Sequence, residues 1–133
     1  MDMYREELLE HWRSPQNFGK IEDATLIIDQ LNPLCGDQVT FYFKIKNGKV
    51  KNVKFTGNGC AISIAASSIL SEKIKNTSVK SLSKITGKDV LALLGGPVAP
   101  ARLKCAFLSL EVVRRIALND EGLKTKAKIS VSR

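Results

Sequence analysis

The chain has 133 residues, an apolar fraction of 44% and a formal net charge of +8. This length and apolar fraction predict one domain with one hydrophobic core. No continuous apolar run approaches the roughly 20 residues of a membrane span or a secretory signal, so we expect a cytoplasmic protein with no membrane partner. The excess of Lys and Arg favours anionic partners in general without choosing among them.

The first half of the sequence predicts a helix and then strands. An amphipathic helix is expected from Met3 to Trp12, and Pro15 and Gly19 end it. The β-branched run from Ala24 to Pro33 predicts an edge strand, because proline cannot donate to a sheet ladder. Apolar and polar residues then alternate on both sides of the turn sequence KNGK, which predicts a hairpin with one apolar and one lysine-rich face.

The second half of the sequence reads as helical. Predicted helices cover the small and apolar residues Ala61–Ile74, two short pieces around Ser78–Ile85 and Asp89–Leu94, and a last segment from about Arg102 to Leu118. Strands followed by helices indicate the α+β class, with a small antiparallel sheet of about three strands packed against helices. We expect residues 1–118 to form a single domain and the polar residues 119–133 to form a flexible tail.

Each of the three cysteines lies near the boundary between two predicted elements. Cys35 precedes the hairpin, Cys60 follows it at a helix start, and Cys105 lies near the start of the last helix. Three distant cysteines make a poor disulfide framework and suggest reduced thiols. If the loops gather at one end of the sheet, the three thiols converge, and we take this convergence as a hypothesis.

The neighbours of the cysteines favour a shared metal site. Gly36 permits a positive φ, so the Cys35 sulfur and the Asp37 carboxylate can point into the same space. Helix amides at Cys60 favour a thiolate there, and Lys104 gives Cys105 similar help. Three thiolates and one carboxylate suit tetrahedral zinc, or a cluster held less firmly than by four cysteines.

Purely structural roles for these residues remain open as alternatives to a metal site. A free cysteine is often a small buried hydrophobe, and an aspartate such as Asp37 is more often a turn-stabilising residue than a ligand. His11 is the only histidine, which excludes Cys/His finger patterns; beside Trp12 it is expected to be structural or to contact a partner. The hairpin lysines are most simply a solvated face, and because no aromatic and basic stacking motif accompanies them we expect no nucleic-acid partner.

Four stretches of the chain resemble one protein family. YREELLEHWRSPQNFG, NPLCGD, TGNGCAISIAASSIL and PARLKCAFLSLEVV are similar to the U-type iron–sulfur cluster assembly proteins, the family of IscU, SufU and the N-terminal domain of NifU. The resemblance extends to Leu118, with the three cysteine motifs in the expected order. It is closer to the SufU branch, because a basic residue, Lys104, precedes the third cysteine where IscU-type proteins have histidine.

The resemblance implies a fold, a metal site and a partner. The fold would be a SufE/IscU-like α+β sandwich. Cys35, Asp37, Cys60 and Cys105 match the family's metal-site residues, which bind zinc and are implicated in holding iron and a labile [2Fe–2S] cluster. Cys105 matches the thiol that accepts persulfide sulfur from a cysteine desulfurase of the SufS/IscS type, and Lys104 would stabilise its thiolate.

The chain also departs from both branches. The segment from Cys60 to Cys105 is short, as in IscU, although Lys104 is SufU-like. The stretch VAPARLKC matches the chaperone-binding LPPVK of IscU only loosely, so a chaperone partner is not implied. We therefore expect a scaffold or sulfur acceptor that stimulates a desulfurase, rather than a stand-alone enzyme, and that serves cluster-accepting proteins. The alternatives are a zinc-dependent sulfurtransfer partner that holds no cluster, and a small basic binding module with a structural zinc.

Overall fold

The computed structural model describes residues 3–33, 36–118 and 129–131, and its elements up to residue 118 follow the order that the pattern predicts. The elements are α1 (Met3–Arg13), β1 (Leu26–Asn32), β2 (Asp37–Lys46), β3 (Lys49–Asn58), α2 (Ala61–Ile74), α3 (Val79–Leu82), α4 (Gly87–Leu93), the 3-10 turn η1 (Pro100–Arg102), α5 (Leu103–Ala106), α6 (Leu108–Leu118) and β4 (Ile129–Val131). The longest helix in this described part, α2, has 14 residues, and none there could cross a membrane.

The sheet contains the three antiparallel strands that the sequence predicts. β3, β2 and β1 are neighbours in that order and pair antiparallel. The turn between β2 and β3 places Asn47 and Gly48 at positive φ, which is the geometry of a tight two-residue hairpin. Alternation along β2 and β3 buries Phe41, Phe43 and Phe55 on one face, where their rings stack with centroid separations of 5.3 and 5.9 Å.

A fourth strand was not predicted. β4 pairs in parallel with β1 at Leu26, Ile27 and Ile28, so β1 is internal over these residues instead of being an edge strand throughout. Pro33 lacks only its own amide hydrogen, so the start of β1 can still pair with a further strand, and the prediction of an edge strand was wrong for these residues. Residues 119–128 and 132–133 of the expected tail lie outside the described residues.

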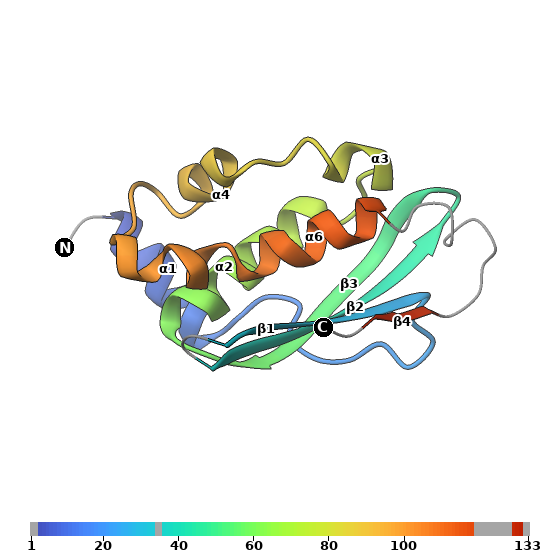
Figure 1. The fold of residues 1–133 in the computed structure, drawn as a ribbon, viewed down its shortest axis with the longest axis horizontal. Coiled ribbons are helices and arrows are strands. Elements are labelled where there is room, and N and C mark those ends of the chain that lie inside the picture. The colour runs from blue at the N-terminus through green and yellow to red at the C-terminus, as the bar shows by residue number, and fades with distance from the viewer. Residues whose placement is uncertain (1–2, 34–35, 119–128, 132–133) are drawn as a thin grey trace.

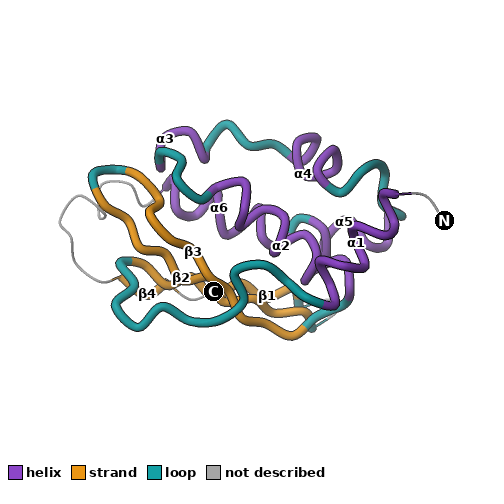
Figure 2. The backbone as a smooth tube through the Cα atoms, turned by 180° about the vertical axis from the view of Figure 1, so that it is seen from behind, coloured by secondary structure: helices purple, strands orange, loops and turns teal. Residues whose placement is uncertain are grey.

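Helices cover one face of the sheet, as expected for an α+β sandwich (Figure 1), and the view from behind shows the same two layers (Figure 2). α2 is the inner helix: most of its residues from Ser63 to Ile74 are buried, and it contacts α1, β3 and α6. α1 is attached to α2 through His11, whose Nδ1 lies 2.7 Å from the hydroxyl of Ser68. Of the two roles expected for His11, this contact supports the structural one.

The last predicted helix is broken. Phe107 takes φ −95° and ψ 2° between α5 and α6, so the turn that carries Cys105 is separated from the longer helix behind it. The ring of Phe107 packs against Gly87 at the start of α4, where a Cβ would lie only 3.2 Å from the ring. The break therefore coincides with the packing of Phe107 on α4, which the helical period alone does not reveal.

Candidate metal centre

Three of the four predicted metal-site residues meet at one end of the sheet. One ligand atom each from Asp37, Cys60 and Cys105 lies within 4.8 Å of the other two. Asp37 and Cys105 are buried and Cys60 is half-buried, while both described cysteines are free thiols. The predicted convergence of thiols is therefore seen for Cys60 and Cys105, which Asp37 joins from a third segment of the chain, whereas Cys35 lies outside the described residues.

Each of the three residues sits where one element meets another. Asp37 is the first residue of β2, and its partner in the register with β1 is Asn32. Cys60 is the N-cap of α2, with extended backbone angles of φ −71° and ψ 169°. Cys105 lies on the single turn α5 that precedes the break at Phe107. α2 contacts both α5 and α6, and α6 also contacts β2, so the packing of these elements brings the three side chains to one place.

The Asp37 carboxylate is held in its ionised form. Burial raises the pKa of Asp37, but hydrogen bonds from Ser63, Cys105 and Cys60 together outweigh burial and hold the pKa below its usual value. The Ser63 hydroxyl donates directly to Oδ2 of Asp37, and the Cys60 Sγ lies 3.7 Å from the same hydroxyl. At neutral pH the site therefore presents a buried carboxylate charge beside two sulfurs.

Two glycines in the stretch TGNGC make room for this arrangement. A Cβ on Gly59 would lie 3.1 Å from Cγ of Asp37, so the absence of a side chain allows the carboxyl group to approach the helix start. A Cβ on Gly57 would lie 2.5 Å from the carbonyl oxygen of Gln38, closer than real contacts permit. The two glycines thus let β3 and the following turn pass tightly against the beginning of β2.

The loop that carries Cys35 is described only at its two ends. Cys35 itself, and its neighbour Leu34, lie outside the described residues. Gly36 has φ +74°, as the sequence predicts, and its amide donates to the carbonyl of Asn32 at 2.8 Å. This hydrogen bond closes a tight turn from the end of β1 to the start of β2. The position of Cys35 as a ligand therefore stays a prediction.

The three donor atoms fit a tetrahedral metal. With Zn–S bonds of about 2.3 Å, the ligand atoms of a tetrahedral zinc are separated by about 3.8 Å. Ligand atoms within 4.8 Å of one another need to move by only about 1 Å to reach that spacing. The set of one oxygen and two sulfurs leaves a fourth position, which is the place that the sequence assigns to Cys35.

Two further residues near the metal site, Lys104 and Ser63, differ from what the sequence led us to expect. Lys104 is exposed, and no carboxylate in the described ranges forms an ion pair with it. Ser63 is 1% exposed and donates a hydrogen bond to Asp37, and it was not among the residues predicted for the site. The available signal was its spacing, since it lies three residues after Cys60 at the first turn of a predicted helix.

Comparison with known proteins decides the family. Residues 3–127 match the NifU-like N-terminal domain family. The chain belongs to this family. This NifU-like domain is 37% identical over 113 residues to the iron–sulfur cluster assembly scaffold protein IscU 1 of Archaeoglobus fulgidus, covering 85% of this chain and 73% of that protein. It is 34% identical over 137 residues to the zinc-dependent sulfurtransferase SufU of Bacillus subtilis, covering 90% and 92%.

Solved structures show the same fold. The SufU from Fervidobacterium islandicum superposes on the NifU-like domain with a TM-score of 0.70 at 27% identity, over 83% of this chain and 93% of that one. The N-terminal part of a NifU-like protein from Brucella abortus gives a TM-score of 0.73 at 20% identity, over 90% and 95%. The expected α+β fold is therefore confirmed, and both IscU and SufU are among the relatives.

Proposed function

We propose that this NifU-like domain is an iron–sulfur cluster assembly protein that accepts persulfide sulfur from a cysteine desulfurase at Cys105. Its metal site would consist of Cys35, Asp37, Cys60 and Cys105. The observation that carries the proposal is the meeting of the last three within 4.8 Å, with Asp37 and Cys105 buried and Cys60 half-buried. It is supported by relatives that are described as cluster assembly scaffolds and as a zinc-dependent sulfurtransferase.

The residues of the site suit a sulfur-transfer step. A bound zinc or ferrous ion would keep the thiols deprotonated and close together. The Cys105 thiolate then attacks the outer sulfur of the desulfurase persulfide; the S–S bond of the donor breaks as the new S–S bond on Cys105 forms. The donor cysteine leaves as a thiolate, so the sulfur changes carrier with no external oxidant or reductant.

Asp37 is the ligand best suited to exchange. Its carboxylate already accepts a hydrogen bond from Ser63, so its charge stays compensated when it is not bound to metal. A thiolate at Cys60 has only a contact of 3.7 Å to the same hydroxyl. Release of Asp37 from a metal would therefore cost less free energy than release of a sulfur ligand. It would open a coordination position and leave no uncompensated charge on the carboxylate.

Metal analysis and mass spectrometry test the proposal. Untagged protein purified without chelator should contain about one zinc or iron, and incubation with a cysteine desulfurase and cysteine should add sulfur to Cys105. Cys105→Ser should remain folded and lose the added sulfur. A structural zinc module would instead unfold when chelator removes the metal and would leave Cys105 unmodified.

A second experiment distinguishes a cluster scaffold from a protein that only relays sulfur. The distinction is needed because the relatives include both scaffolds and a sulfurtransferase. Ferrous iron, cysteine and a desulfurase are combined with the NifU-like domain under anaerobic conditions. A coloured species with cluster absorption, transferable to an apo-ferredoxin, assigns the scaffold role. Persulfide on Cys105 with zinc alone, and no cluster absorption, assigns the relay role.

A further inference from the structure

Two thiols of the candidate metal centre lie close enough to react with each other. The sulfur atoms of Cys60 and Cys105 lie within 4.8 Å of each other. Both residues are thiols and not halves of a disulfide. Since the S–S bond of a disulfide is about 2.05 Å long, the two sulfurs need to approach by less than about 3 Å to form one.

The side chain of Cys60 is the one suited to make this approach. It is half-buried, whereas Cys105 is only 4% exposed. In the described part of the chain the Cys60 side chain forms no capping hydrogen bond with α2, and its contact with the Ser63 hydroxyl is long, at 3.7 Å. A change of χ1 rotamer at this extended residue therefore moves its sulfur over the required distance at little cost.

The Asp37 carboxylate keeps the two thiols together when no metal holds them. Against burial, which raises the pKa of Asp37, hydrogen bonds from Ser63, Cys105 and Cys60 hold that pKa below its usual value. One carboxylate is thus the shared acceptor of both thiols. The pair therefore stays assembled in the metal-free protein, where its sulfurs are available for chemistry.

A persulfide on Cys105 leaves one chemical step undone. The outer sulfur of a persulfide is at the oxidation level of elemental sulfur, and two electrons are needed to turn it into the sulfide of an iron–sulfur cluster. Two thiols supply two electrons when they join as a disulfide. Within the described ranges, Cys60 is the thiol placed to combine with Cys105 in this way.

We propose that Cys60 is a resolving thiol that releases the sulfur held by Cys105 as sulfide. This inference rests on the proposed function. Cys60 loses its proton to solvent and attacks Sγ of Cys105; the bond from that atom to the outer sulfur breaks, and the outer sulfur leaves with the electron pair as hydrosulfide. A disulfide between Cys60 and Cys105 remains, and a dithiol reductant returns both residues to thiols. A metal bound to Cys60 holds the step back until that ligand is released.

The unaltered protein gives the main test. The zinc-loaded domain is charged with sulfur by a cysteine desulfurase and cysteine, separated from both, and then treated with a zinc chelator without added thiol. We expect about one sulfide per charged protein and a disulfide that joins the peptides of Cys60 and Cys105 in mass spectrometry. A persulfide that persists on Cys105, that moves to Cys60, or that yields a bond to Cys35 instead would overturn the proposal.

Cys60→Ser removes the resolving thiol and keeps the acceptor. After the same treatment it should release sulfide at least about a hundredfold more slowly, because attack from within the site is lost and no thiol in solution replaces it. Ser67→Ala is the control, since Ser67 is buried on the same helix and donates to the backbone carbonyl of Ser63; it should release sulfide at the unaltered rate. Equal rates for Cys60→Ser and Ser67→Ala would contradict the resolving role.

A chemical sulfur donor separates this inference from the proposed function. If the desulfurase leaves Cys105 without sulfur, the proposed function fails, and inorganic polysulfide is used to charge the domain in its place. The disulfide between Cys60 and Cys105 should still form when the chelator is added. Sulfur that stays on Cys105 without this disulfide would refute the inference with either donor.

Discussion

Ser63→Ala tests how the Asp37 carboxylate is stabilised. The substitution removes a hydrogen bond between two groups that are only 1% and 6% exposed, and a hydrogen bond to a charged group contributes about 1.5–3 kcal/mol. We therefore expect the free energy of unfolding of the metal-free, reduced protein to fall by about that amount at pH 7. Urea unfolding followed by circular dichroism measures the difference.

The pH dependence of this difference identifies its origin. Asp37 has a lowered pKa in the folded protein, so it contributes stability above its unfolded pKa of about 3.9 and loses that contribution as the pH falls through the folded value. Removal of the Ser63 donor raises the folded pKa, so the two proteins should differ most at neutral pH and converge in acid.

Ser67→Ala is the matched control, because Ser67 is equally buried one turn later and donates only to the backbone carbonyl of Ser63, at 2.9 Å. Ser67→Ala should lower the free energy of unfolding by less than Ser63→Ala does, and this loss should not depend on pH. Equal losses for both variants at every pH would refute the idea that Ser63 stabilises a charged carboxylate.

Three further predictions concern the surroundings of the site. Gly57→Ala should lower the free energy of unfolding by more than about 1 kcal/mol in urea, because the new Cβ would lie 2.5 Å from the carbonyl oxygen of Gln38. Arg115→Met should cost about 1–3 kcal/mol in the same assay, since it leaves the buried Gln30 acceptor unsatisfied; no loss would show that water replaces the guanidinium. Cys60→Ala should lower the bound zinc measured by mass spectrometry of the native protein at least tenfold, and an unchanged zinc content would remove this thiol from the ligand set.

Local patterns in the sequence were sufficient for most of the fold. Alternation along the hairpin predicted which faces of β2 and β3 are buried, and the turn KNGK predicted the tight connection between them. The helix over Ala61–Ile74 has the bounds that its small residues indicate. These features depend on neighbours within a few residues, so a single sequence carries them.

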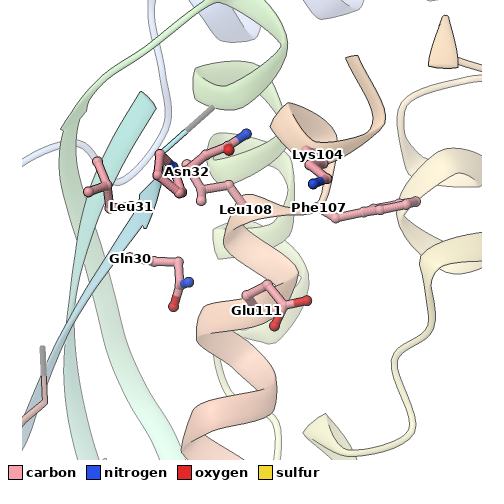
Figure 3. Close-up of a pocket in the computed structure, with 8 residues that line it drawn as sticks. Gln30, Leu31, Asn32, Lys104, Phe107, Leu108 and Glu111 are labelled. Carbon is pink, nitrogen blue, oxygen red and sulfur yellow. The ribbon is translucent and has the colours of Figure 1, made fainter. Parts of the chain in front are cut away.

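Features that depend on distant contacts were missed or only hypothesised. The pairing of β4 with Leu26–Ile28 joins residues 103 positions apart, as Leu26 and Ile129 show, and no local period indicates it. The break at Phe107 accompanies its packing on Gly87, which belongs to a different helix. The hydrogen bond from Arg115 to Gln30 likewise joins residues 85 positions apart. Local sequence patterns therefore do not predict the pocket that Gln30 lines beside the site (Figure 3).

The sequence by itself determined the residue types of the candidate site and the local geometry around them. Residues adjacent in the sequence predict this local geometry: a glycine at positive φ before Asp37, a helix start at Cys60 and a basic neighbour of Cys105. Only the tertiary structure decided that Asp37, Cys60 and Cys105 meet within 4.8 Å, because the contacts of α2 with α5 and of α6 with β2 set the distances between these residues.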